Sequence, residues 1–165
     1  MQVPTFEDIV AAREFIGPYL PKTPLIRVHA LSELLDCDYY AKPENLQPIG
    51  AFKVRGGVNL VGTLSDDAPG RGLVSATTGN HGQSIGHGGR LFASRVVIYA
   101  PAENVNEAKL RAMRELGAEV RLHGRDFDEA RNACEQAAKE EGFRYVHSAN
   151  EAKLIAGVGT MGLEI

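Results

Sequence analysis

The sequence has 165 residues, 44% hydrophobic and 24% charged, with a formal net charge of −3. This composition is typical of a soluble globular protein with one domain, or one domain and part of another. The mildly acidic balance favours neither nucleic acid nor an anionic membrane as a partner, and no apolar run approaches transmembrane length. Cys37 and Cys134 stand far apart, which indicates reduced thiols in the cytoplasm and predicts neither a disulfide framework nor a metal site.

The first predicted element is a helix that begins near Thr5. Thr5 and Asp8 stand three residues apart, as in a capping box, and apolar residues follow at helical spacing. Gly17-Pro18 ends this helix. The proline-rich residues 21–25 then predict extended chain, and residues 38–41 predict a short strand.

From Gly72 onward, strand-like runs alternate with helical ones. The strands are predicted at residues 73–76, 96–99, 120–122 and 145–146, and the helices at residues 80–92, 106–116 and 126–139. This alternation predicts a parallel sheet with crossover helices. We therefore expect an α/β protein with a small doubly wound parallel-sheet subdomain over residues 72–149. Residues 1–71 and 150–165 are expected to belong to a larger α/β domain in which this subdomain is embedded.

The C-terminal residues predict a helix that opens near Gly159, so the sequence stops inside an element. We therefore expect the chain to be part of a longer protein. Residues 157–162 also match the pattern G-x-G-x-x-G, which raises the alternative of a dinucleotide-binding module. That motif requires a strand before it and an acidic residue about 20 positions later. Residues 151–156 instead indicate helix or loop, and the sequence ends too early.

A first candidate site is the turn between the strand at 73–76 and the following helix. Its sequence, Ser75 to Gln83, contains hydroxyl groups, glycines and an amide. Ligands of parallel sheets collect at such junctions, and the free N–H groups at a helix N-terminus favour an anion such as a carboxylate. The same residues also suit an ordinary helix cap without a ligand.

A second candidate is Lys53, which follows a Pro/Gly turn and stands between Phe52 and Val54. Partial burial between apolar neighbours lowers the pKa of a lysine amine, as a residue that forms a Schiff base requires. Taken alone, this pattern also fits a surface lysine whose aliphatic stem covers apolar neighbours.

Together these segments resemble fold-type II pyridoxal-phosphate enzymes, most closely the threonine/serine dehydratase (threonine ammonia-lyase) and serine racemase branch. The resemblance extends over essentially the whole chain. It is carried by Pro21 to Leu25, Glu44-Asn45-Leu46-Gln47-Pro48, Phe52-Lys53-Val54-Arg55-Gly56, Thr78-Gly79-Asn80-His81-Gly82-Gln83 and Ala156 to Glu164.

The resemblance implies a role for each matching residue. Lys53 would hold pyridoxal 5'-phosphate through a Schiff base and shuttle the α-proton. Phe52 would pack against the pyridine ring, and Asn80 would hydrogen-bond its 3′-oxygen. The substrate carboxylate would be bound by a loop made of Thr77, Thr78, Gly79 and His81. Thr78 stands where family racemases carry a serine that acts on the opposite face, so either proton transfer or binding is open to it.

The function implied by the resemblance is deaminating dehydration of L-threonine or L-serine to a 2-oxo acid and ammonia. Racemisation of serine or another amino acid is the alternative within the family, and a non-catalytic fragment is an alternative outside it. The resemblance places the phosphate-binding glycine loop downstream of Ile165. The isolated chain is therefore expected to be inactive, and the complete enzyme is expected to be a homo-oligomer, a dimer or a tetramer.

Overall fold

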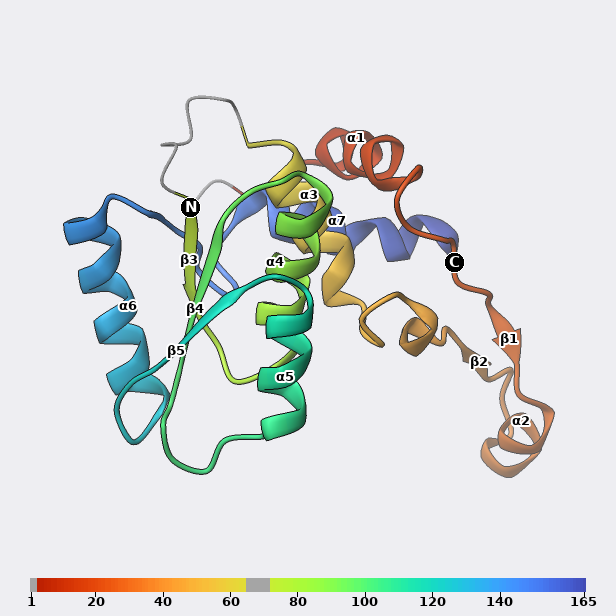
Figure 1. The fold of residues 1–165 in the computed structure, drawn as a ribbon. Helices are drawn as coiled ribbons and strands as arrows, with labels where there is room; N and C mark the ends of the chain where they lie inside the picture. Colours follow the sequence, from red (N-terminus) through yellow and green to blue (C-terminus); the bar gives the residue numbers. More distant parts are fainter. Residues whose placement is uncertain (1–2, 65–71) are drawn as a thin grey trace.

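Four parallel strands form the centre of the structure, a computed structural model that describes residues 3–64 and 72–165 (Figure 1). They lie in the order β5-β4-β3-β6, and every neighbouring pair is parallel. Each strand predicted after Gly72 is present within one residue of its expected bounds. The strands are β3 (Leu73–Ala76), β4 (Val96–Ala100), β5 (Glu119–Leu122) and β6 (Arg144–Tyr145).

Helices cover both faces of this sheet, which confirms the predicted doubly wound arrangement. Figure 1 shows α4 (Asn80–Leu91) and α5 (Glu107–Glu115) on one face and α6 (Phe127–Glu141) on the other. Asp126 caps α6 by accepting a hydrogen bond from the Glu129 N–H. Gly142 ends it in the left-handed conformation that glycine adopts without strain.

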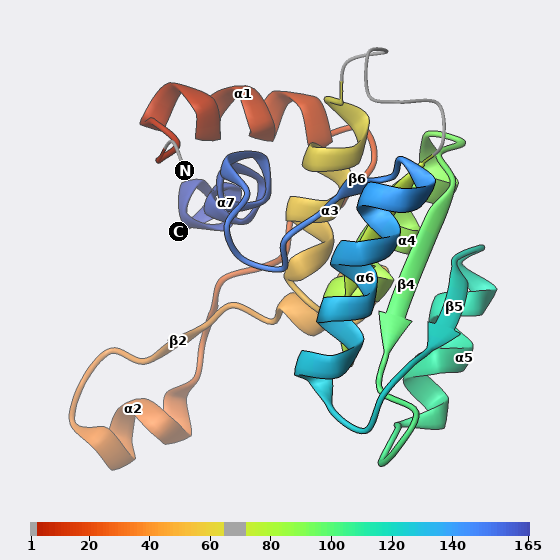
Figure 2. The same cartoon turned by 90° about the vertical axis from the view of Figure 1, so that its left-hand side faces the viewer.

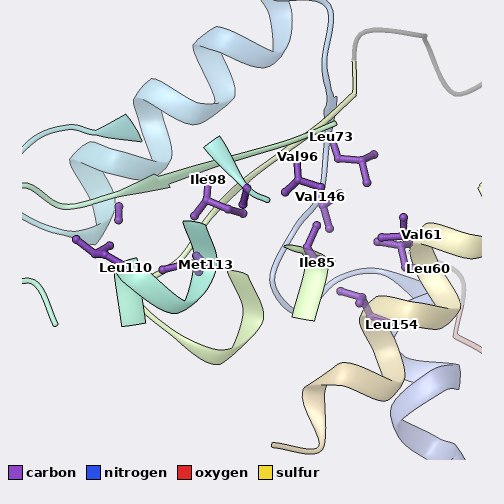
Figure 3. Close-up of a cluster of buried hydrophobic side chains, with 12 residues drawn as sticks. Leu60, Val61, Leu73, Ile85, Val96, Ile98, Leu110, Met113, Val146 and Leu154 are labelled. Atoms are coloured by element: carbon purple, nitrogen blue, oxygen red, sulfur yellow. The ribbon is translucent and has the colours of Figure 1, made fainter. Parts of the chain in front are cut away.

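Alternate residues of the strands supply two apolar layers. Val96, Ile98 and Ala100 of β4 face α4 and α5, whereas Val97 and Tyr99 face α6. The layer under α4 and α5 continues onto α3 (Lys53–Gly62) through Leu60 and Val61 (Figure 3). Because helices bury both faces of the sheet, β3 and β4 consist mostly of consecutive apolar residues.

A helical group packs beside the sheet. It consists of α1 (Phe6–Ile16), α3, α7 (Ala152–Gly159) and the short 3₁₀ helix η2 (Thr160–Glu164). The predicted capping box of α1 is present, because Thr5 and Asp8 each accept a hydrogen bond from the other's backbone N–H. Helix α3 runs close along α4, since a side chain at Gly57 would overlap Ser84.

The prediction of a helix that opens near Gly159 was wrong. Helix α7 begins at Ala152 and ends at Gly159, and η2 follows it directly. The helix starts earlier because Leu154 and Ala156 bury apolar side chains in the interior. The G-x-G-x-x-G run at 157–162 therefore lies in helical segments and not in a strand-to-helix turn.

Residues 26–41 leave the body of the molecule. This excursion contains β1 (Ile26–Arg27), α2 (His29–Leu35) and the antiparallel partner β2 (Tyr40–Ala41). The 3₁₀ helix η1 (Glu44–Leu46) lies back against α3, because Glu44 accepts hydrogen bonds from Arg55. Figures 1 and 2 both show α2 away from the sheet, and Leu34 of α2 is 78% exposed. Within residues 3–64 and 72–165, no helix is both long and apolar enough to span a bilayer.

Candidate active site

Lys53 and the turn after β3 line one cavity, although they are more than 20 positions apart in the sequence. The cavity has a volume of about 360 Å³. Its wall contains every residue of the predicted carboxylate loop, together with Lys109 of α5 and Ser148 of the loop after β6. The lining residues are Lys53, Ala76, Thr77, Thr78, Gly79, Asn80, His81, Lys109, Phe127 and Ser148.

The N-terminus of α4 presents backbone donors at this cavity. The N-cap residue Gly79 supplies no side-chain cap, and its own N–H donates to Thr77 Oγ1 at 3.1 Å. Within the described residues, the N–H groups of Asn80 and His81 have no acceptor. Free donors at the positive end of a helix dipole stabilise an anion. The turn therefore has the electrostatics of a carboxylate site.

Two side chains of this turn are buried and two are exposed. Thr77 and His81 are buried, whereas Thr78 and Asn80 are exposed where the turn meets the cavity. Gly79 lies beneath the side chain of Lys109, because a Cβ atom at this position would be 3.0 Å from Lys109 Nζ. This arrangement places a cation beside the donors of α4.

His81 is anchored to the sheet by a defined hydrogen-bond chain. Ser75 Oγ donates to the Val146 carbonyl at 2.7 Å, so the same hydroxyl accepts from His81 Nε2 at 3.0 Å. The imidazole therefore carries its proton on Nε2 and keeps a lone pair on Nδ1. Burial, then the charge of Lys53, then that of His147 lower the pKa of His81 to about 4. A neutral imidazole thus links the turn to β3 and to the end of β6.

Lys53 is half-buried and is the first residue of α3. Its backbone carbonyl accepts a hydrogen bond from Ser84 Oγ of α4, which ties the starts of the two helices together. Lys53 and His81 also line a second, more apolar cavity of about 240 Å³. Its remaining walls are Phe52, Ser148, Ala149, Leu154, Ile155 and Val158. Lys53 therefore stands between a polar cavity and an apolar one.

Residues 16–165 match the model of the family described as pyridoxal-phosphate dependent enzyme. The chain belongs to this family. The expected α/β class and family are thus confirmed.

Named relatives and solved structures of this family agree with the predicted branch. A catabolic L-threonine dehydratase of Staphylococcus aureus (strain N315) is 38% identical over 96% of the chain and 46% of the relative. Threonine deaminase isoform 2 of Solanum lycopersicum is 28% identical with a TM-score of 0.88, over 99% of this chain and 47% of that one. Serine racemase of Dictyostelium discoideum is 30% identical with a TM-score of 0.89, over 98% and 52%. The chain spans about half the length of these proteins.

The residues present fit the ring of pyridoxal phosphate and the carboxylate of an amino-acid substrate. The apolar cavity beside Lys53 offers Phe52, Leu154 and Ile155 as walls for an aromatic ring. The polar cavity offers the free N–H groups of α4 for the carboxylate of an amino acid. The roles of the individual residues stay predictions.

Sequence reasoning placed Ser75 in the candidate turn without a role, and it missed Ser84, Lys109 and Ser148. Ser75 orients His81, Ser84 holds the Lys53 backbone, and Lys109 and Ser148 line the polar cavity. Ser75 carried a usable signal, because a serine in the middle of a buried apolar strand requires a hydrogen-bond partner. Lys109 carried none, since its position in the first turn of α5 resembles that of any surface lysine.

Proposed function

We propose that the protein containing this chain uses pyridoxal phosphate to convert L-threonine or L-serine into a 2-oxo acid and ammonia. The observation that carries the proposal is the cavity shared by Lys53 and the N-terminus of α4. An enzyme that acts on an α-amino acid with this cofactor needs a lysine amine to hold the cofactor and a site that binds the substrate carboxylate. This cavity brings the two together. The similarity to threonine dehydratases supports the same reaction.

The cofactor would be held by residues on both sides of Lys53. The Lys53 amine would supply the covalent link, Phe52 would pack against the ring, and the exposed amide of Asn80 would hydrogen-bond the ring hydroxyl oxygen. When bound, pyridoxal phosphate withdraws electrons from the α-carbon of the amino acid, which makes its α-proton acidic.

The substrate would be oriented by its carboxylate. The N–H groups of Asn80 and His81 donate to that carboxylate, and the neutral His81 side chain holds them in place through Ser75. With the carboxylate fixed, the Lys53 amine would take the α-proton and would give a proton to the β-hydroxyl, which leaves as water. Water then converts the product into the 2-oxo acid and ammonia.

Racemisation is a second candidate, because the exposed hydroxyl of Thr78 lines the same cavity as Lys53. A racemase needs a second proton donor on the face opposite to Lys53. The branched side chain of threonine restricts its hydroxyl to few rotamers, which favours binding over proton transfer. We therefore assign Thr78 to substrate binding.

The experiment that tests this function measures 2-oxo acid and D-amino acid together. The whole protein, loaded with pyridoxal phosphate, is given L-threonine or L-serine. The proposal predicts 2-oxo acid without D-enantiomer, and it predicts that Thr78→Ala raises KM. If D-enantiomer forms and Thr78→Ala abolishes it while elimination continues, the racemase assignment replaces this one. Without either product, the proposed function is wrong.

We also propose a cytoplasmic homo-oligomer in which residues 72–149 are the small subdomain of a larger cofactor domain. A reduced environment is supported by the two free cysteines, of which Cys37 is exposed and Cys134 is buried. Burial raises the pKa of Cys134 to about 12, so its thiol is unreactive. Sedimentation of the whole protein tests the oligomeric state.

A further inference from the structure

A buried cluster of charges lies at the first turn of α3, two residues beyond Lys53. Its centre is Arg55, of which only 1% is exposed. The guanidinium donates to Glu44 through Nε at 2.8 Å and Nη2 at 2.9 Å. It also donates to Glu164 through Nη1 at 2.7 Å and Nη2 at 2.9 Å. Both carboxylates are therefore chelated by one side chain.

Lys42 completes the charge balance of this Arg55 cluster, which we define as Lys42, Glu44, Arg55 and Glu164. The Lys42 ammonium lies 2.9 Å from Glu164 Oε2, so two cations face two anions. The hydroxyl of Thr23 donates to Glu44 Oε1 at 2.6 Å. The cluster thus joins segments that come from the extended residues near 23, from η1, from α3 and from η2.

The Arg55 cluster is the side-chain anchor at the start of α3. The N-cap residue Phe52 makes no side-chain cap, and the first turn contains no acidic residue. Besides the hydrogen bond from Ser84 Oγ to the Lys53 carbonyl and the apolar packing of Val54, this turn is held by the four charge-assisted bonds of Arg55. Because the first turn of a helix has unpaired N–H groups, an uncapped start frays unless tertiary contacts hold it.

We infer that Arg55 is a positioning residue for Lys53. Clamped by Glu44 and Glu164, it fixes the turn from which the Lys53 amine enters the cavity shared with α4. The inference deepens the proposed function and rests on it, since it assumes that Lys53 is the cofactor lysine. Buried ion pairs seldom stabilise a fold more than apolar side chains of equal volume. We therefore assign the Arg55 cluster to fixing the position of the first turn of α3.

A matched control exists on the surface of the sheet subdomain. Arg121 also chelates a carboxylate, that of Glu141, and pairs with Glu119, but its side chain is 27% exposed. It lies on β5, outside both cavities that Lys53 lines. Arg121→Lys therefore makes the same chemical change as Arg55→Lys without touching α3.

The test uses the whole protein loaded with pyridoxal phosphate and compares Arg55→Lys with Arg121→Lys. Readouts are kcat per mole of cofactor-bearing lysine, KM for L-threonine, and the circular dichroism of the cofactor band. Lysine keeps the charge of Arg55 but loses its bidentate geometry. We expect Arg55→Lys to lower kcat by about 10- to 100-fold, to leave KM within about threefold, and to weaken the dichroism. Arg121→Lys should leave all three unchanged.

Equal kcat and equal dichroism in Arg55→Lys and the unaltered protein would overturn the inference, whatever the change in melting temperature. If Arg55→Lys does not fold, Glu164→Gln is measured in the same way. It keeps the Arg55–Glu44 chelate and is expected to show a smaller loss of kcat at unchanged KM, and no loss would overturn the inference. If the unaltered protein turns over neither substrate, the proposed function fails, and the dichroism alone decides the role of Arg55.

Discussion

The two sides of Lys53 are held in place by different physical means. On the sheet side, β3, β4 and α4 pack apolar residues such as Ile98 and Ile85, and one neutral chain joins His81 to Ser75. On the other side, the Arg55 cluster joins η1, α3 and η2 through charges. Apolar packing tolerates small changes of volume, whereas a buried charge tolerates no loss of its partner. The geometry around Lys53 therefore depends on one neutral hydrogen-bond chain on the sheet side and on paired charges on the other side.

Removal of the Arg55 guanidinium is expected to lower the free energy of unfolding the most. Arg55→Met leaves Glu44 and Glu164 buried with only Lys42 for compensation, which should cost about 3–5 kcal/mol of unfolding free energy. Arg121→Met on the surface should cost at most about 1 kcal/mol. Urea denaturation of the two variants tests the contrast. Equal losses would show that burial does not distinguish the two clusters.

The next effect concerns how folding stability depends on pH, which should differ between the sheet side and the Arg55 side of Lys53. The unfolded chain protonates His81 near pH 6.5, but the folded pKa is about 4, so stability falls as the pH drops from 6.5 to 4. The loss is about 3 kcal/mol at most. His81→Gln should remove this part of the pH profile, and an unchanged profile between pH 6.5 and 4 would contradict the neutral assignment.

The stability contributed by the Arg55 cluster should be lost at lower pH than that contributed by His81. Burial raises the pKa of Glu164, but hydrogen bonds from Arg55 and Lys42 more than offset this, and the pKa is lowered to about 2. Its contribution to stability is therefore present above pH 4.5 and is lost as the pH falls from 4.5 toward 2. Comparing the denaturation profiles of Glu164→Gln and the unaltered protein tests this window. A difference confined to higher pH would contradict it.

The smallest expected effect lies in the apolar layer. Ile98 is fully buried between the sheet and the helices α4 and α5, so Ile98→Val removes one methylene from a packed site. The expected cost is about 0.5–1.5 kcal/mol, with catalysis unchanged. Urea denaturation and a threonine assay measure the two quantities. A loss as large as that of Arg55→Met would show that the sheet side is no more tolerant than the charged side.

The parallel sheet and its helices were predictable because their signals are local. The strand at 73–76 is a short apolar run ended by turn residues, and Gly142 marks the end of α6. In contrast, α3 was not predicted, because Gly56, Gly57 and Gly62 lower its helix propensity. The structure explains these glycines by contact, since side chains there would overlap Leu154, Ser84 and Phe15.

The site was predictable only where a motif stands in one short segment. Lys53 and the turn at 77–81 carried recognisable patterns, and the structure brings them to one cavity. Glu44, Arg55 and Glu164 also stand in segments that carry the resemblance, but their pairing was not predicted, because Arg55 is 11 residues from Glu44 and 109 residues from Glu164. No periodicity links positions so far apart, so their pairing emerges only from the packing of α3 between η1 and η2.

The central claim is that Lys53 is the cofactor lysine, and chemical trapping tests it most directly. Two lysines, Lys53 and Lys109, line the same cavity, so proximity alone does not choose between them. The whole protein is incubated with pyridoxal phosphate, reduced with borohydride, digested and mapped by mass spectrometry. We predict a pyridoxyl group on Lys53 and none on Lys109, whereas labelling of Lys109 or of another lysine without Lys53 would contradict the account.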